Sequence, residues 1–400
     1  MFVLADDLTG AAETAAALMS PARPARIALS GPAPAAPAVV ADLDSRHHPR
    51  AFDLVREALR QAGDRQVFVK VDSLLRGNVA ATVSACLDAP VVLAPALPSA
   101  GRTVVDGVPY IQGVPLRETR AWRAERRPAP ASVAEALGDV PWVHVPVGAD
   151  LSGVVAAGRV AVCDAETDAD LDAIVAAALR GPARTRLVGA GGLAAALGRA
   201  LGGRPGRCEV PRGDGRLLAV VGTAEPAAAE QVGLLIEHGF RNVALDGATG
   251  AALTPAARRV RDALAAGPAV LTVRGPAPST LTRTLGELVR EALGGVPADL
   301  VLTGGETARR VLDALGVREL IPVDQVHHGA VHSRTPEGHS VVTRPGSFGD
   351  VDSLLRIAAH LDPHLLHPKS KGYEPLPALA TCTCGCPTNC YWFSGPIDRD

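Results

Sequence analysis

The feature that most constrains the fold is an alternation of short apolar runs with alanine-rich helical stretches, joined by glycine-containing turns. Residues 1–5 form an apolar run of the length of a buried strand, Thr9-Gly10 supplies turn residues, and 11–18 has high helix propensity. This alternation predicts an α/β fold with mainly parallel sheets. The pattern continues with expected strands at 67–72 and 91–98 and expected helices at 51–63 and 168–181.

Residues 202–216 are rich in glycine, proline and arginine and have no apolar period, so they are the best domain boundary. We expect two α/β domains, over residues 1–205 and 215–366, with ligand sites at the carboxyl ends of the strands and in the cleft between the domains. The remaining 367–400 are expected to be a disordered tail. Its cysteines lack the spacing of a common zinc module, with a soft-metal site as the alternative: Cys382, Cys384, Cys386 and Cys390.

Charge and hydropathy exclude several classes of protein. The formal net charge of −2 gives no electrostatic basis for binding nucleic acid or an anionic membrane. No apolar run has the length of a membrane span, and the N-terminus lacks the basic segment of a signal peptide. Cys86, Cys163 and Cys208 are scattered singly, which suits reduced thiols. We therefore expect a cytoplasmic protein that binds small molecules, with a homodimer left open as its oligomeric state.

Two adjacent aspartates, Asp6 and Asp7, follow the first apolar run directly. In open α/β sheets ligands bind where strands end and helices begin, so this junction is a candidate ligand site. The alternative is that one of the two carboxylates only caps the helix that follows.

Lys70 is the only lysine among the first 368 residues, although arginine is abundant there. The lysine side chain ends in a compact ammonium, whereas arginine ends in a broad planar guanidinium. We therefore expect that arginine cannot replace lysine at position 70. The alternative is that the lysine is there by chance. Mixed acids, cations and amides lie around Lys70 at 70–78 and also at 41–48, and this mixture suits an anionic, hydroxyl-rich small molecule. A structural ion network is the alternative. The residues concerned are Asp42, Asp44, Ser45, Arg46, Asp72, Ser73, Arg76 and Asn78.

Three segments share the order strand, glycine turn, helix: 187–197, 218–231 and 300–315. Glycine lets backbone N–H groups approach a phosphate, and a helix N-terminus favours negative charge. The first segment also has the outline of a dinucleotide fingerprint, but the strand expected before Glu209 is missing. An NAD-dependent dehydrogenase of acid sugars is therefore kept only as an alternative.

Five motifs in order, "ADDLTGA", "KVDSLLRGN", "PALPSAGRTVVDGVPYIQGVPLRET", "LTGGETA" and "VVTRPGSFGD", resemble those of the four-carbon acid sugar kinases over about residues 1–360. The resemblance implies an N-terminal acid-sugar-binding domain and a C-terminal nucleotide-binding domain. It also implies phosphorylation by ATP of the terminal hydroxyl of threonate, erythronate or 3-oxotetronate. Mg²⁺ is expected to bridge the phosphates, mostly through water.

The motifs also assign roles to single residues. Asp7, or Asp6 beside it, would accept the hydroxyl proton, and Lys70 would act with them in catalysis. The substrate-binding positions implied are Arg46, Asp72, Arg76, Gly77 and Asn78. The nucleotide-binding positions implied are Thr223, Gly304, Gly305, Glu306, Thr307 and Gly346.

The chain departs from the family pattern at several positions. Leu74 stands where threonine is usual, which we expect to remove a hydroxyl near the sugar, and Arg344 stands where lysine is common. The sequence therefore does not choose among the three acids. A non-catalytic relative that only binds sugar acids is a further alternative.

Overall fold

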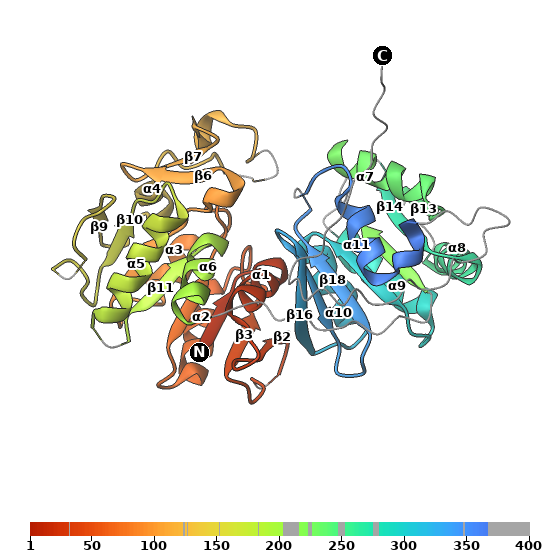
Figure 1. Ribbon diagram of the computed structural model, residues 1–400, viewed down its shortest axis with the longest axis horizontal. Coiled ribbons are helices and arrows are strands. Elements are labelled where there is room, and N and C mark those ends of the chain that lie inside the picture. The colour runs from red at the N-terminus through yellow and green to blue at the C-terminus, as the bar shows by residue number, and fades with distance from the viewer. Residues whose placement is uncertain are drawn as a thin grey trace, which may run out of the picture. The chain divides into compact units, whose positions relative to one another are not determined.

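The computed structural model describes residues 1–366 except 32, 123–124, 126, 152, 183, 203–215, 223–225, 247–252, 275–279 and 347–348. Within this part, Met1–Leu366 forms one compact unit on a 15-stranded sheet (Figure 1). The predicted tail at 367–400 and most of the predicted boundary segment lie outside the described residues.

The N-terminal half of the sheet is parallel throughout. Its strands in spatial order are β2 (Ala25–Ala28), β3 (Ala38–Asp42), β1 (Phe2–Ala5), β4 (Val67–Lys70), β11 (Arg186–Gly189), β5 (Val91–Ala94), β10 (Val160–Cys163) and β9 (Trp142–Val145). Its helices are α1 (Leu8–Leu18), α2 (Ala51–Ala62), α3 (Val79–Ser84), α4 (Val133–Leu137), α5 (Asp168–Arg180) and α6 (Gly191–Ala200). A separate small antiparallel sheet contains β6 (Arg102–Val105), β7 (Val108–Ile111) and β8 (Val114–Pro115).

The C-terminal half is mixed. Parallel strands β13 (Arg241–Asp246), β14 (Ala269–Arg274), β12 (Leu217–Val221), β15 (Asp299–Thr303) and β18 (Ser340–Arg344) are followed by antiparallel β17 (Ala330–Arg334) and β16 (Glu319–His327). The helices are α7 (Pro226–Glu237), α8 (Leu253–Ala266), α9 (Leu281–Leu293), α10 (Gly305–Ala314) and α11 (Ser353–Leu361).

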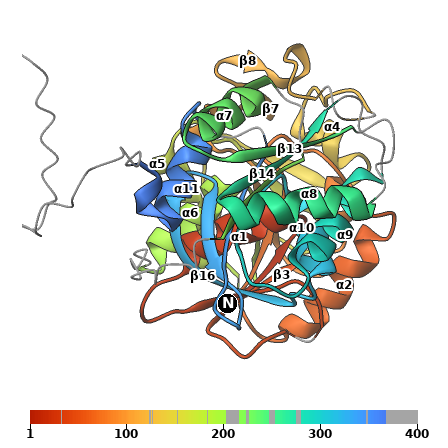
Figure 2. The same ribbon diagram turned by 90° about the vertical axis from the view of Figure 1, so that its right-hand side faces the viewer.

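Alternate side chains of the C-terminal strands form two separate apolar layers, as the two-residue period of a strand requires. In β12, Leu217 and Ala219 pack with α7 and α11, whereas Leu218 and Val220 belong to the core that contains α8, α9 and α10. Figure 2 shows α7 and α11 on one side of these strands and α8 and α9 on the other. The sheet is therefore covered on both faces, as parallel sheets are.

The two halves are joined by a short antiparallel pairing of β2 with β16, in which Ile27 lies opposite Leu320. Helix α1 contacts α6 and β3 of the N-terminal half and also β16, β17 and α10 of the C-terminal half. In Figure 1 it lies between the two groups of strands. The predicted α/β fold with mainly parallel sheets is confirmed. Among the described helices, none combines the length and the apolar character that crossing a membrane requires.

Candidate active site

A cavity of about 240 Å³ lies where strands from both halves end. Asp7 follows β1, Lys70 ends β4, Gly304 follows β15 and Gly346 follows β18. The full lining is Asp7, Thr9, Gly10, Glu13, Arg46, Lys70, Asp72, Ser73, Arg76, Leu97, Arg102, Gly304, Gly305, Pro345 and Gly346. Residues predicted for the sugar acid and residues predicted for the nucleotide therefore share one cavity.

Arg46 holds both opening aspartates. Its guanidinium donates to the two carboxylate oxygens of Asp6 at 2.8 and 2.9 Å and to Oδ1 of Asp7 at 2.8 Å. Burial raises the pKa of Asp6 although Arg46 opposes this. For Asp7 burial also opposes ionisation, but Arg46, Lys70 and the Thr9 hydroxyl outweigh it and lower the pKa. Of the pair, Asp7 is therefore the one that lines the cavity and whose surroundings favour the ionised form.

Asp7 is also the N-cap of α1, because its Oδ1 accepts from the Gly10 backbone N–H at 2.9 Å and its Oδ2 accepts from the Thr9 hydroxyl at 2.6 Å. The capping interpretation of this aspartate is thus confirmed, and its role in binding a ligand stays a prediction. These bonds fix the direction of its carboxylate, and the residue lines the cavity.

The Lys70 ammonium is buried between Asp7 and Glu13. It donates to the Val71 carbonyl at 3.2 Å and lies 3.5 Å from Glu13 Oε2. A side chain at Gly10 would place its Cβ only 2.8 Å from Asp7 Oδ1 and 2.9 Å from Lys70 Nζ, so the absence of a side chain there leaves room for both charged groups. Glu13 was missed by sequence reasoning, although it is the only charged residue of α1.

The loop after β4 presents a second ion pair. Arg76 donates to both oxygens of Asp72, at 2.8 and 2.7 Å, and the backbone N–H groups of Leu74 and Arg76 donate to Oδ2. Burial opposes ionisation of Asp72, but Arg76 holds its pKa far below the usual range. Arg102, from β6, reaches the cavity and donates to the Ser73 hydroxyl. Arg102 lies within a motif that the sequence identified, yet it was not named as a site residue.

Two predicted substrate-binding residues do not line the cavity. Gly77 has a φ of 79°, and a Cβ there would lie 2.3 Å from the Arg46 carbonyl oxygen. Asn78 donates its amide hydrogens to the carbonyl oxygens of Ser45 and His48, at 3.3 and 2.8 Å. Both residues therefore shape the loop that carries Arg46, and their contact with the substrate stays a prediction.

The expectation for Leu74 is corrected. Its side chain is buried in a small cluster with Leu116 and Trp122, and it is not part of the cavity lining. The Trp122 indole N–H donates to the Leu74 carbonyl at 3.1 Å. Replacement of threonine by leucine at this position therefore packs the 72–76 loop against the small sheet and takes no hydroxyl away from the cavity.

The predicted nucleotide turn begins helix α10. Gly304, its N-cap, has a φ of 87°, and both Gly304 and Gly305 line the cavity with Gly346. Glu306 lines a neighbouring cavity of about 410 Å³ and accepts from the Thr282 hydroxyl at 2.9 Å. Thr307 is buried against Gly222, where a Cβ would come within 2.4 Å of its hydroxyl. Thr223 lies outside the described residues.

Helix α10 is tied to the N-terminal half by charge. Arg309 Nη1 lies 2.9 Å from Asp42 Oδ2, and Arg310 pairs with Asp44. Burial raises the pKa of Asp42 to about 7 although Arg309 opposes this. These two aspartates, which the sequence grouped with the ligand-binding charges, therefore belong to an ion network between the halves.

In the glycine turn at 187–197, the Glu13 carboxylate fills the space next to Gly191. A Cβ on Gly191, the first residue of α6, would lie 2.3 Å from Glu13 Oε1. A dinucleotide phosphate at this helix N-terminus would meet that carboxylate at contact distance. The arrangement therefore disfavours the NAD-dependent alternative.

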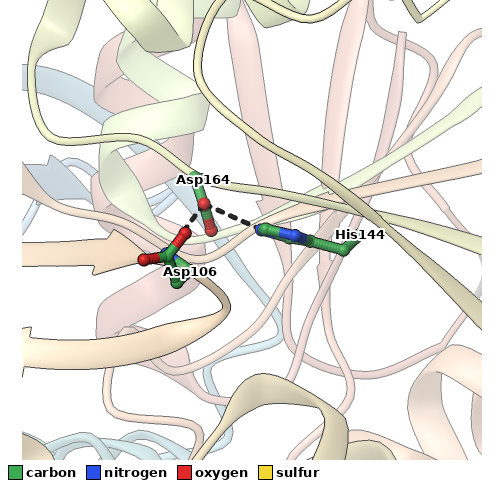
Figure 3. Close-up of side chains that lie close together, drawn as sticks. All are labelled: Asp106, His144 and Asp164. Carbon is green, nitrogen blue, oxygen red and sulfur yellow. Dashed lines mark hydrogen bonds and ion pairs between the residues drawn. The ribbon is translucent and has the colours of Figure 1, made fainter.

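One further group of possible metal ligands lies away from the cavity: Asp106, His144 and Asp164 (Figure 3). The Asp164 carboxylate accepts from the backbone N–H groups of Asp106 and Gly107, both at 2.9 Å, and lies 2.8 Å from His144 Nε2. Because its oxygens already accept these bonds, we interpret Asp164 as an anchor for the β6–β7 turn. That hairpin carries Arg102 to the cavity.

Comparison with known proteins agrees with this geometry. A family model described as a sugar-binding N-terminal domain matches residues 1–197, and one described as a nucleotide-binding C-terminal domain matches 218–354. The boundaries at 205 and 215 stay predictions.

A D-threonate kinase of Cupriavidus necator is 32% identical over 397 residues, covering 88% of this chain and 95% of the relative. A 3-oxo-tetronate kinase of Burkholderia multivorans is 28% identical and covers 90% and 96%. The crystal structure of a Salmonella typhimurium protein, 22% identical, has a TM-score of 0.72 over 89% of this chain and 98% of that one, which shows the shared fold alone. The chain therefore belongs to the four-carbon acid sugar kinase family, with its sugar-binding domain before its nucleotide-binding domain.

Proposed function

We propose that this protein is an ATP-dependent kinase that phosphorylates the terminal hydroxyl of a four-carbon sugar acid, with D-threonate as its preferred acceptor. The observation that carries the proposal is the shared cavity, in which Asp7 and Lys70 lie with Gly304 and Gly305. The choice of D-threonate follows the curated relative with 32% identity.

The acid end of the substrate needs cations. Lys70, Arg76 and Arg102 all line the cavity, and each can donate to a carboxylate. Arg46 lines it too, but its guanidinium donates to both Asp6 and Asp7, whereas Arg76 pairs closely with Asp72 alone. We assign the substrate carboxylate to the first three and assign Arg46 the task of orienting Asp7.

Asp7 is the assigned proton acceptor, and Asp6 is not, because Asp6 does not line this cavity. The lowered pKa of Asp7 makes it a weak base. Phosphoryl transfer passes through a loose transition state in which positioning and charge stabilisation contribute most, so a weak base that orients the hydroxyl is sufficient.

The turn at Gly304–Gly305 is assigned to the phosphates of ATP. A glycine with positive φ at the N-terminus of α10 suits backbone approach to an anion. The carboxylates beside this turn, Asp7 and Glu306, are oxygen ligands of the kind that Mg²⁺ prefers, so the residues present fit the metal that accompanies ATP. When bound, Mg²⁺ neutralises charge on the phosphates.

The test is a coupled kinase assay with D-threonate, D-erythronate and 3-oxo-tetronate, followed by mass spectrometry of the product. Asp7→Asn is the matched variant: it should still bind ATP in calorimetry but lose turnover. Folded wild-type protein that phosphorylates none of the three acids would refute the proposal. Full turnover by Asp7→Asn would refute the assignment of the base.

A further inference from the structure

Among the described residues, two acids of the main cavity lining have no role in the mechanism above: Asp72, which Arg76 already holds, and Glu13. Glu13 lies in the middle of α1, and its side chain is 16% exposed. Its carboxylate therefore faces the cavity from the side of α1, next to the Lys70 ammonium.

Three groups surround the carboxylate, and one of them is His328, whose Nε2 lies 3.9 Å from Oε1. Lys70 Nζ lies 3.5 Å from Oε2, and Oε1 rests against Gly191 at the start of α6. The N-terminus of a helix carries a partial positive charge, which stabilises an anion placed there. Carboxylate oxygens accept hydrogen bonds, so a hydroxyl that faces Glu13 finds an acceptor there.

We propose that Glu13 determines which four-carbon acid the protein uses, by accepting a hydrogen bond from a secondary hydroxyl of the substrate. The inference rests on the proposed function and extends it to the choice between acids. Asp7, Lys70 and Glu13 line the same cavity, and Lys70 Nζ lies 3.5 Å from Glu13 Oε2. A substrate whose terminal hydroxyl faces Asp7 and whose carboxylate reaches the cations therefore brings its inner carbons within reach of Glu13.

The two acids differ at such an inner carbon. D-threonate carries a hydroxyl at carbon 3, which can donate to Glu13, whereas 3-oxo-tetronate carries a ketone there. A ketone oxygen has no hydrogen to donate and would meet the carboxylate lone pairs. A site built to bind a hydroxyl discriminates strongly against an analogue that lacks it, because its buried polar group is then left unpaired.

The alternative is that Glu13 only orients Lys70. In that case its loss would weaken the use of both acids to the same extent, because Lys70 is assigned to the carboxylate that both share. A change in the ratio between acids therefore separates the two roles.

The experiment measures kcat/KM for D-threonate and for 3-oxo-tetronate with wild-type protein and with Glu13→Gln, full length. Glutamine keeps the shape of glutamate but can donate from its amide to a ketone. We expect wild-type protein to prefer D-threonate and the ratio of the two kcat/KM values to fall by about 10-fold or more in Glu13→Gln. The matched control is Glu57→Gln, on the exposed surface of α2, which should leave the ratio unchanged.

An unchanged ratio in Glu13→Gln, or a wild-type preference for 3-oxo-tetronate, would overturn the inference. If Glu13→Gln is unstable, calorimetric binding of the two acids to wild-type protein without nucleotide is the second measurement, and equal affinities would overturn it too. Wild-type protein that phosphorylates D-erythronate but neither of these two acids would overturn the inference alone, and wild-type protein that phosphorylates none of the three acids defeats the proposed function itself.

Discussion

Replacing Gly305 by alanine should remove activity while leaving the fold intact. Gly305 is the first residue of α10, and a Cβ built on it lies 2.3 Å from Asp7 Oδ2 and 3.3 Å from the Thr9 hydroxyl oxygen. The backbone of Gly305 does not need positive φ; that requirement belongs to Gly304. The substitution therefore acts through the carboxylate of Asp7.

The size of the effect follows from this distance. An ordinary van der Waals contact begins near 3.4 Å, so the carboxylate must retreat by about 1 Å. A displacement of about 1 Å in a catalytic group costs on the order of 100-fold in rate. Alanine stabilises a helix by about 1 kcal/mol relative to glycine. This gain offsets the loss of similar size that a weakened Asp7 cap would cause. We expect a large fall in kcat with a melting temperature within a few degrees of wild type.

The assay is steady-state kinetics combined with thermal unfolding and calorimetric titration of ATP. Gly233→Ala is the matched control, because Gly233 also lies in a helix but no atom lies within 4 Å of an added Cβ. It should keep full kcat and gain up to about 1 kcal/mol in stability. Normal kcat in Gly305→Ala would show that Asp7 is not the base or does not occupy this position during the reaction.

Three further predictions concern other buried charges. Lys70→Arg should lower kcat/KM by roughly 30- to 1000-fold, measured by steady-state kinetics, because the broader guanidinium does not fit between Asp7 and Glu13. Asp42→Ala and Arg309→Ala should each cost about 3–5 kcal/mol in urea unfolding, and the double variant should cost clearly less than their sum; additive losses would contradict an ion pair that couples α10 to β3. Burial, with smaller effects of His360 and Arg334, lowers the pKa of His332 from 6.5 to about 3. The unfolded chain thus takes up this proton first, so wild type should lose stability as pH falls from about 6.5 toward 3, and His332→Leu should lose less in pH-dependent melting.

The opening of the chain could be predicted from the sequence because its structure is local. Strand β1, the turn and α1 follow from adjacent residues, and so does the position of Asp7 between them. The glycine turn at Gly304–Gly305 was likewise placed correctly at a helix N-terminus. In each case a strand that ends at the edge of a parallel sheet determines where the next residues lie.

The partners of the charges could not be predicted, because they depend on contacts distant in sequence. Asp42 and Arg46 lie in one short segment, yet Asp42 pairs with Arg309 of α10 and Arg46 with the opening aspartates. The direction of the Leu74 side chain could not be predicted either. Leu74 lies in a loop without periodicity, and only the presence of Trp122 shows that it points away from the cavity.

Three glycines in the first turns of helices, Gly10, Gly191 and Gly305, show why a glycine beside a helix N-terminus does not by itself identify a nucleotide site. At Gly10 and Gly191 the missing side chain makes room for charges of the chain itself: Asp7 and Lys70 at the first, Glu13 at the second. At Gly305 it makes room for Asp7 on one side, and the preceding Gly304, with its positive φ, turns the backbone toward the cavity. A helix N-terminus stabilises an anion in either case. In one turn the anion is a carboxylate of the protein, and in another the position is open to a ligand phosphate. The difference depends on whether an acid of the chain already fills the space.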